Sequence, residues 1–413
     1  MTFAVIAGTR PELIKQYPVM RLLDLADIDY KFIYTGQHYD YELSDKFIEE
    51  FRIRKPDYYF KLTNSSEPVR QVYEIMANVG DILQELNPSM VIVQGDTNSV
   101  LASALAAVKS GIKIAHIEAG LRSYNWKMYE EHNRRIVDHI SDILFAPTEE
   151  SAINLRNEQV HGDIYVTGNT VIDAVNLYFH HHQSNKSDNK NAYSENETLS
   201  RLSSSSSSVL NSVLRNFKSK RKSTASAQEV FTNCSNEGNT LNFVLVTLHR
   251  SENVDNQDFL KQAITAMSAT GLDYIFPMHP HTLKRLHEFG LENLITKNIR
   301  VIEPVGYYDF LMLLKMCRFV ITDSGGVQEE ITSPLINKHA IILRDSTERP
   351  ESVQSGHAIL CKADWQEILG AIKNFDSGYP EPENTCPYGS GNSAEIIVEI
   401  LKKSYVKQKF SRL

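Results

Sequence analysis

The sequence predicts an α/β protein with two domains, each built on a parallel sheet covered by helices. The chain has 413 residues, more than a single hydrophobic core usually accommodates. Short β-rich runs alternate along it with helical patterns, which is typical of parallel α/β folds. These runs are almost continuously apolar, as expected for strands buried on both faces. Together the three observations indicate doubly wound sheets.

The first domain is expected over residues 1–178. Its strand-like runs cover residues 3–8, 30–36, 90–95, 112–120, 142–148 and 164–169. Helical patterns begin at about Glu12, Ser99 and Glu149. Strand and helix alternate in the order that a doubly wound sheet requires.

The composition changes between residues 179 and 240, where histidine, serine and basic runs leave little to build a core. We interpret this segment as a flexible insertion, with at most a short helix over 209–217. Strand-like runs resume at Leu241 and define a second domain, residues 241–390. A helical stretch at 394–406 lies in a C-terminal segment, 391–413, and its residues leave open whether it packs against the first domain.

Composition and charge exclude several classes of protein. With 42% hydrophobic residues, 23% charged residues and a net charge of -8, the chain lacks the basic excess of a nucleic-acid-binding protein. No stretch approaches the roughly 20 apolar residues that cross a bilayer, and the amino terminus does not resemble a signal peptide. The four cysteines have no paired spacing, so we expect a cytoplasmic protein. No histidine cluster justifies a metal site, and no cofactor is expected.

Polar residues that directly follow the strands are the candidates for function, because ligands bind beyond the carboxyl ends of parallel strands. Five strand ends are unusually polar. They carry Arg10, Glu12 and Lys15; Asp96; Glu118; His249 and Arg250; and Asp323, Ser324, Gly325 and Gly326. Carboxylates gathered in a cleft provide acid and base forms for proton transfer.

Each motif taken alone has a simpler alternative. The turn at Asp323–Gly326 suits an anion at a helix N-terminus and equally an ordinary helix cap. Glu131, at the start of a helix, is explained by the helix dipole alone. His249 is the residue best suited to contact a diphosphate or move a proton, against the alternative of a buried core histidine. The charged run from Arg344 to Glu351 is typical of a surface salt-bridge cluster.

Taken jointly, the motifs resemble the UDP-N-acetylglucosamine 2-epimerase family. The matching segments occur in family order: GTRPELIK, TGQHYD, GDTNSVLASALAA, HIEAGLRS, EEHNRRIVDHISDILFAPTE, VTGNTVIDAV, TLHRSENVD, DSGGVQEE and RDSTERPES. The resemblance implies two Rossmann-like domains of the glycosyltransferase-B-like type, with the active site in the cleft between them. It also implies a homodimer.

The resemblance implies epimerisation of UDP-N-acetylglucosamine at C2, through elimination of UDP to a 2-acetamidoglucal and re-addition of UDP. The product would supply N-acetylmannosamine-type sugars for polysaccharide or glycan synthesis. By motif position, the acid and base candidates are Asp96, Glu118 and Glu131. The residues expected to hold UDP or the sugar are Arg10, Lys15, His249, Tyr307, Phe310, Ser324, Gly325, Gly326, Glu330 and Arg349, with His249 also a candidate for catalysis.

The sequence departs from the family pattern in three motifs and in one insertion. TGQHYDY and HRSEN replace TGQHREM and HRREN, two regions associated in bacterial members with activation by a second substrate molecule. The loop at 331–340 is two residues longer than usual, and the serine-rich insertion is foreign to typical members. Three alternatives stay open: a hydrolysing relative that releases N-acetylmannosamine, a glycosyltransferase of the same fold, and a catalytically silent sugar-nucleotide-binding protein.

Overall fold

The computed structural model of the chain forms two compact units. The first unit comprises residues 1–177 and 386–413, and the second comprises residues 178–385. The structure describes residues 2–37, 48, 53–63, 67–184, 241–362, 364–380, 382 and 385–410. The short helix expected at 209–217, and most of the insertion expected at 179–240, lie outside these residues.

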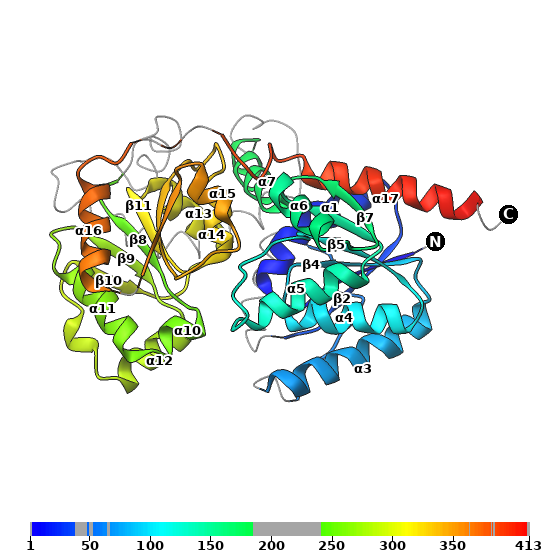
Figure 1. The fold of residues 1–413 in the computed structure, drawn as a ribbon, viewed down its shortest axis with the longest axis horizontal. Coiled ribbons are helices and arrows are strands. Elements are labelled where there is room, and N and C mark those ends of the chain that lie inside the picture. Colours follow the sequence, from blue (N-terminus) through cyan, green and yellow to red (C-terminus); the bar gives the residue numbers. More distant parts are fainter. Residues whose placement is uncertain are drawn as a thin grey trace, which may run out of the picture. The chain divides into compact units, whose positions relative to one another are not determined.

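Within the described residues, the first unit contains a seven-stranded parallel sheet in the order β3-β2-β1-β4-β5-β6-β7 (Figure 1). The strands are β1 (Phe3–Ala7), β2 (Tyr30–Tyr34), β3 (Tyr58–Tyr59), β4 (Met90–Gln94), β5 (Lys113–Ile117), β6 (Ile143–Ala146) and β7 (Asp163–Val166). The helices between them are α1 (Arg10–Leu25), α3 (Pro68–Leu86), α4 (Asn98–Lys109), α5 (Tyr129–Ile140) and α6 (Glu149–Asn157). Helix α7 (Thr170–Ser184) follows β7 and continues past residue 177 into the second unit. The predicted parallel α/β fold is confirmed.

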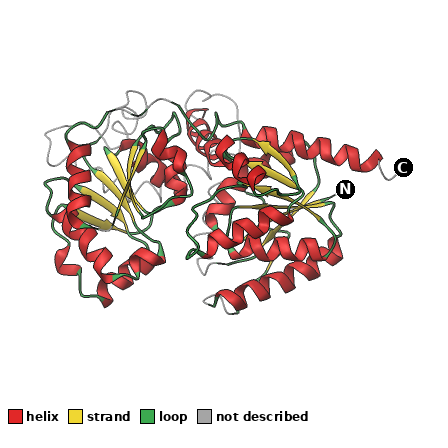
Figure 2. Cartoon of the chain, viewed as in Figure 1, coloured by secondary structure: helices red, strands yellow, loops and turns green. Residues whose placement is uncertain are grey.

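The second unit repeats this architecture with a six-stranded parallel sheet in its described part, ordered β10-β9-β8-β11-β12-β13 (Figure 2). Its strands are β8 (Val244–Thr247), β9 (Tyr274–Pro277), β10 (Ile299–Ile302), β11 (Phe319–Thr322), β12 (His339–Leu343) and β13 (Ala358–Cys361). Its helices are α10 (Ser251–Val254), α11 (Gln257–Ser268), α12 (Pro280–Glu288), α13 (Tyr307–Met316), α14 (Gly325–Glu330), α15 (Pro350–Gln354) and α16 (Trp365–Asp376), with a 3₁₀ turn at Glu292–Leu294.

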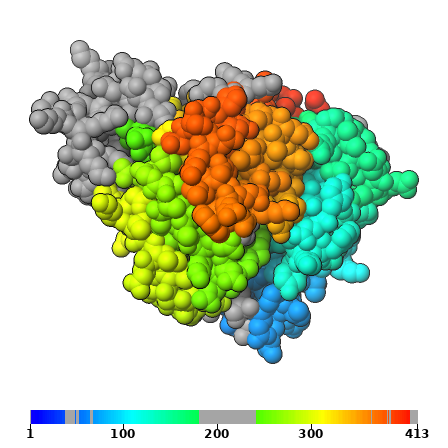
Figure 3. Space-filling view, turned by 60° about the vertical axis from the view of Figure 1, so that its left-hand side comes forward, coloured from blue at the N-terminus to red at the C-terminus, as the bar shows by residue number. Residues whose placement is uncertain are grey.

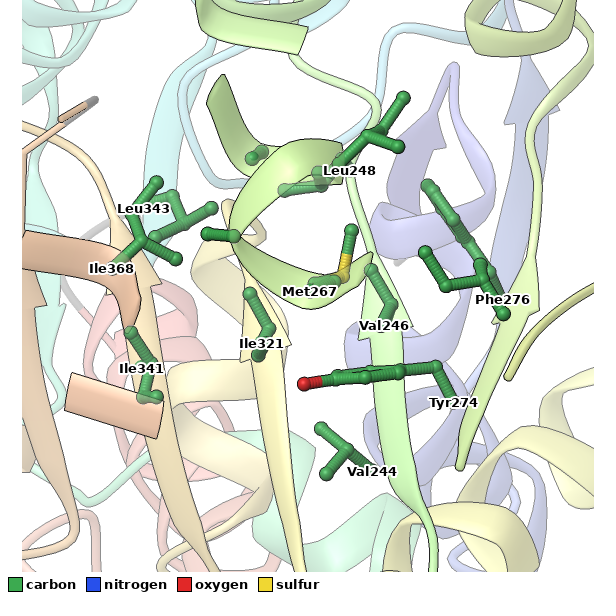
Figure 4. Packing of buried hydrophobic residues seen from close by; sticks show 14 of the residues in the cluster. Val244, Val246, Leu248, Met267, Tyr274, Phe276, Ile321, Ile341, Leu343 and Ile368 are labelled. Atoms are coloured by element: carbon green, nitrogen blue, oxygen red, sulfur yellow. The ribbon is translucent and has the colours of Figure 1, made fainter. Parts of the chain in front are cut away.

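The core of the second unit follows from alternation along its strands. Val244 and Val246 of β8 point to the same face of the sheet, because successive side chains of a strand point to opposite faces. Ile321 of β11 joins them, and Met267 of α11 and Ile368 of α16 pack over them (Figure 4). Burying each such side chain contributes about 1.5–3 kcal/mol relative to its exposure. In the space-filling view α16, in orange, lies against α11, in green (Figure 3).

The C-terminal helix α17 (Ser393–Phe410) belongs to the first unit, where it packs beside α1 (Figure 1). The carboxylate of Asp173, on α7, accepts hydrogen bonds from the backbone N–H groups of Ser393 and Ala394 at 3.2 and 2.9 Å. It therefore satisfies two of the unpaired donors at the start of α17. Among the residues that the structure describes, no helix is long and apolar enough to cross a bilayer.

The strand order reverses direction once in each sheet, between β1 and β4 and between β8 and β11. Such a reversal separates the loops that follow the two strands, and ligands of doubly wound sheets bind there. Arg10 begins α1 directly after the loop that follows β1, and Asp96 lies in the loop after β4; the loops after β8 and β11 carry His249 and Ser324. The fold thus places the candidate residues at the expected edge of each sheet.

Candidate functional site

Glu118 follows β5 and is held as a buried carboxylate. Its Oε1 lies 2.6 Å from Lys15 Nζ, and both side chains are almost fully buried. Gln94 donates to Oε2, and Asn169 Nδ2 donates to Oε1 at 3.4 Å. The backbone of Glu118 has a φ of 69°, in the left-handed region that non-glycine residues rarely adopt. Strain of this kind, held in place by surrounding contacts, is concentrated at functional sites.

Asp96 follows β4 and remains partly accessible, with 28% of its side chain exposed. Its Oδ2 accepts two hydrogen bonds from the guanidinium of Arg134, from Nη2 at 2.9 Å and from Nε at 3.3 Å. Asn133 Nδ2 donates to the carbonyl oxygen of Asp96 at 2.9 Å. Helix α5 therefore fixes both the side chain and the backbone of Asp96.

Glu131 is completely buried at the start of α5 and is surrounded by donors. Its carboxylate accepts hydrogen bonds from the backbone N–H and the hydroxyl of Ser123, both at 2.8 Å, from Arg134 at 2.6 Å and from Arg135 at 3.0 Å. Burial opposes its ionisation, but the hydrogen bonds from Ser123 and the charge of Arg134 outweigh burial and lower the pKa of Glu131. Glu131 therefore does more than complement the helix dipole, because it anchors the arginine that binds Asp96.

Glu12 is a buried carboxyl that connects the starts of two helices. Its oxygens accept from the backbone N–H of Gly8, from the hydroxyl of Thr9 at the start of α1, and from the hydroxyl of Thr97 at the start of α4, each at 2.8 Å. Burial raises its pKa to about 7, and the hydrogen bonds offset only part of this. The sequence places Glu12 among the polar residues after the first strand, and the pattern Thr9-x-x-Glu12 is a capping-box signature.

Eight side chains of the first unit form an alternating series of basic and acidic groups, which we call the charge chain. Neighbouring groups approach to 2.5–3.0 Å in the order Asp96, Arg134, Glu131, Arg135, Glu158, Arg122, Asp138 and His116. Burial opposes the ionisation of Asp138, but the hydrogen bond and charge of His116, together with Arg122, hold its pKa below the usual value. Of these eight residues, the sequence predicts only Asp96 and Glu131 as acid or base candidates.

In the second unit, Asp323 holds the loop that carries His249. The buried carboxylate accepts from the backbone N–H of His249 at 3.1 Å, from that of Arg250 at 3.1 Å and from Asn253 Nδ2 at 3.1 Å. Ser324, the N-cap residue of α14, makes no side-chain capping hydrogen bond. The side chain of His249 is 42% exposed, so His249 is not a core histidine. Asp323 thus connects the loop after β11 to the loop after β8.

Arginines gather around Glu348 beside the start of α14. Arg349 contacts Glu348 and donates from Nε to Glu329 at 2.7 Å, while Arg344 and Arg250 lie 3.0 and 3.6 Å from Glu348. Arg344, Glu348 and Arg349 are buried, so the alternative of a surface salt-bridge cluster is wrong. Three guanidinium groups around one buried carboxylate make this region suitable for an anion.

Gly325 allows Arg349 to approach the start of α14. A Cβ atom on Gly325 would lie 2.5 Å from Nη1 and 2.9 Å from Cζ of Arg349, whereas a Cβ on Gly326 would meet no atom within 4 Å. Arg349 cannot readily move away, because Glu329 and Glu348 hold its guanidinium. The first glycine of the DSGG motif is therefore required by packing.

The remaining residues expected to bind substrate lie on α13 and α14. Tyr307 is buried and its hydroxyl donates to Glu330 Oε1 at 2.8 Å. Phe310 lies one turn further along α13 and is partly exposed. In the first unit Arg10 is partly exposed, whereas the buried Lys15 contacts Glu118. The ligand-binding roles given to these residues stay predictions.

The raised pKa of Glu12 makes the stability of the first unit pH-dependent. As the pH rises, the unfolded chain ionises near 4.5 and the folded protein near 7, so the contribution of Glu12 is lost between these values. The loss amounts to about 3 kcal/mol. Glu12→Gln removes this titration, so we expect the free energy of unfolding of the variant, relative to wild type, to rise by about 3 kcal/mol between about pH 4 and about pH 8.

The measurement is urea unfolding followed by Trp126 fluorescence in a Trp365→Phe background, which leaves one tryptophan of the two. Glu149→Gln, at an exposed carboxylate of the same unit, is the control and should show no such pH-dependent difference. If the difference in free energy of unfolding between wild type and Glu12→Gln did not change with pH, the raised pKa of Glu12 would be contradicted.

Known proteins resemble this chain over nearly its whole length. The family model described as UDP-N-acetylglucosamine 2-epimerase matches residues 21–402. A UDP-N-acetylglucosamine 2-epimerase of Methanococcus maripaludis is 38% identical, over 96% of this chain and 97% of its own. A UDP-2,3-diacetamido-2,3-dideoxy-D-glucuronate 2-epimerase of Pseudomonas aeruginosa is 31% identical, over 98% of this chain and all of its own.

A solved structure of the same family has a fold similar to that of this chain. The UDP-GlcNAc 2-epimerase of Methanocaldococcus jannaschii, crystallised with UDP-GlcNAc and UDP, is 36% identical, covers 98% of this chain and 100% of its own, and superposes with a TM-score of 0.79. The sequence match and the shared fold lead to the same conclusion: the chain belongs to the UDP-N-acetylglucosamine 2-epimerase family.

Proposed function

We propose that this protein is a non-hydrolysing epimerase that interconverts UDP-N-acetylglucosamine and UDP-N-acetylmannosamine. In the proposed reaction a base removes the C2 proton as the C1–O bond to UDP breaks, which leaves 2-acetamidoglucal and UDP. UDP then adds back at C1 while an acid delivers a proton to the other face of C2. The observation that carries the proposal is the buried, strained Glu118 with Lys15 at 2.6 Å, in a chain of this family.

Glu118 is the strongest candidate for proton transfer at C2. The ammonium of Lys15 favours the ionised carboxylate, which is the form that accepts a proton. Asp96 is the second candidate, because its carboxylate is partly accessible while Arg134 fixes its direction. Glu131 is already surrounded by donors from Ser123, Arg134 and Arg135, which favours a supporting role.

The second unit is proposed to hold UDP. The arginines around Glu348 and the start of α14 would bind the diphosphate and stabilise the charge that develops as it leaves. Glu330, fixed by the Tyr307 hydroxyl at 2.8 Å, would accept hydrogen bonds from the ribose. His249 would donate to the diphosphate. We also propose that the protein forms a homodimer.

Incubation with UDP-N-acetylglucosamine in deuterated water tests the reaction. We expect UDP-N-acetylmannosamine with deuterium at C2, because the proton that is removed exchanges with solvent before it returns. Free N-acetylmannosamine would indicate the hydrolysing alternative instead. A C2 proton that remains unchanged, followed by NMR, would contradict both. A parallel incubation with the diacetamido-glucuronate nucleotide tests the sugar named for the Pseudomonas aeruginosa relative.

Glu118→Gln should abolish deuterium exchange at C2 while the protein remains folded, because the amide has nearly the shape of the carboxylate but cannot accept the proton. We expect a loss of at least about a hundredfold, the lower range for removal of a general base. Exchange is measured by NMR and folding by circular dichroism. Near-normal exchange would remove Glu118 from the acid-base set. Glu149→Gln, at an exposed site, is the matched control and should exchange normally.

Gly325→Ala should weaken UDP binding by about tenfold or more, because the new methyl group displaces the Arg349 guanidinium from the start of α14. Isothermal titration with UDP measures this effect. Gly370→Ala is the control, since a Cβ at Gly370 on α16 of the same unit meets no atom within 4 Å. Equal UDP affinities for the two variants would exclude a role of the Gly325–Arg349 packing in binding.

A further inference from the structure

The two ends of the charge chain meet at consecutive residues of one turn. Arg134 binds the carboxylate of Asp96 at 2.9 Å, and His116 Nε2 lies 2.8 Å from the carbonyl oxygen of Gly95. Gly95 has a φ of 86°, and its N–H donates to the carbonyl oxygen of Ile117 at 3.1 Å. The turn that carries Asp96 is therefore held from α5 on one side and from β5 on the other.

Both ring nitrogens of His116 face hydrogen-bond acceptors. Its Nδ1 lies 2.8 Å from Asp138 Oδ1, and its Nε2 lies 2.8 Å from the Gly95 carbonyl. A carbonyl oxygen only accepts hydrogen bonds, so the contact with Gly95 requires the proton on Nε2. Asp138, the partner of Nδ1, also binds Arg122 at 2.7 Å. The lowered pKa of Asp138 agrees with this pairing.

We propose that His116 is a positioning residue for Asp96: its Nε2–H fixes the Gly95 carbonyl and so sets the direction of the carboxylate that follows. The catalytic consequence rests on the function proposed above, whereas the hydrogen bond to Gly95 belongs to the fold. Displacing a reacting group by about 1 Å can lower a rate by about a hundredfold. The competing explanation is a His116–Asp138 pair that only stabilises the packing of α5 on β5.

Two substitutions of His116 separate these explanations. The side-chain amide nitrogen of His116→Gln reaches the position of Nε2 and keeps a donor to Gly95, but loses the contact with Asp138. The side-chain amide nitrogen of His116→Asn reaches the position of Nδ1. It keeps the hydrogen bond to Asp138 but loses the hydrogen bond to the Gly95 carbonyl. We expect C2 deuterium exchange to fall by about a hundredfold in His116→Asn and by less than about tenfold in His116→Gln. The Kd for UDP should stay within about twofold of wild type in both.

A purely structural role predicts that exchange follows the unfolding temperature instead. Val79→Ala, in the core of the first unit, provides a destabilised control with an intact turn. The proposal would be overturned if the two His116 variants had equal rates of C2 deuterium exchange. It would also be overturned if His116→Asn lost no more C2 exchange than Val79→Ala at the same unfolding temperature. If His116→Asn does not fold, the test rests on His116→Gln. A loss of C2 deuterium exchange greater than about tenfold in folded His116→Gln would contradict the positioning role.

Backbone amide hydrogen exchange tests the positioning role without any assumption about the reaction. The peptide containing Gly95, Asp96 and Thr97 should exchange faster in His116→Asn than in His116→Gln, because only the latter keeps the donor to Gly95. Equal protection of this peptide in the two variants would overturn the proposal. If wild-type protein shows no C2 exchange, the proposed function fails, and amide exchange still decides the role of His116.

Discussion

Buried carboxylates hold the loops at the carboxyl ends of both sheets, and the candidate residues depend on them for their positions. A parallel sheet brings strand ends to one edge, but it does not fix the loops that follow. An ionised carboxylate has two oxygens that accept several hydrogen bonds, so it can join donors from separate loops. Glu12 joins the starts of α1 and α4, and Asp323 joins the loop after β11 to the backbone of His249.

The partners of a buried carboxylate decide whether it remains charged. Glu12 and Glu131 are both buried, yet the pKa of Glu12 is raised and that of Glu131 is lowered. Glu12 accepts from two hydroxyls and one backbone N–H, which offset only part of its desolvation. Glu131 contacts two guanidinium groups. The basic neighbours in the charge chain therefore keep Glu131 and Asp138 ionised, and removing one of these neighbours would leave a buried charge without compensation.

The sequence predicts the fold and the edge at which the candidate residues lie, because both follow from the local order of strands and polar loops. It does not predict partners that come from distant elements. Lys15 and Glu118 are 103 residues apart and meet only because β1 and β5 belong to one sheet. The alternating charges around Glu348 and Arg349 are typical of a surface, but the fold buries them beside α14. Glu12 has a local signature in the pattern Thr9-x-x-Glu12, but in the structure the Thr9 hydroxyl donates to Glu12 and does not cap α1.

The position of Lys15 limits how charge can be shared in the proposed reaction. Its ammonium lies 2.6 Å from Glu118, so in this arrangement its positive charge stabilises the carboxylate. A diphosphate needs further positive groups, because the ammonium of Lys15 alone cannot neutralise both the diphosphate and the Glu118 carboxylate. The guanidinium groups around Glu348 are suited to that task, since each offers several donors in a fixed plane. In the proposed reaction the first unit would therefore set the charge of the base, and the second would stabilise the charge of the leaving group.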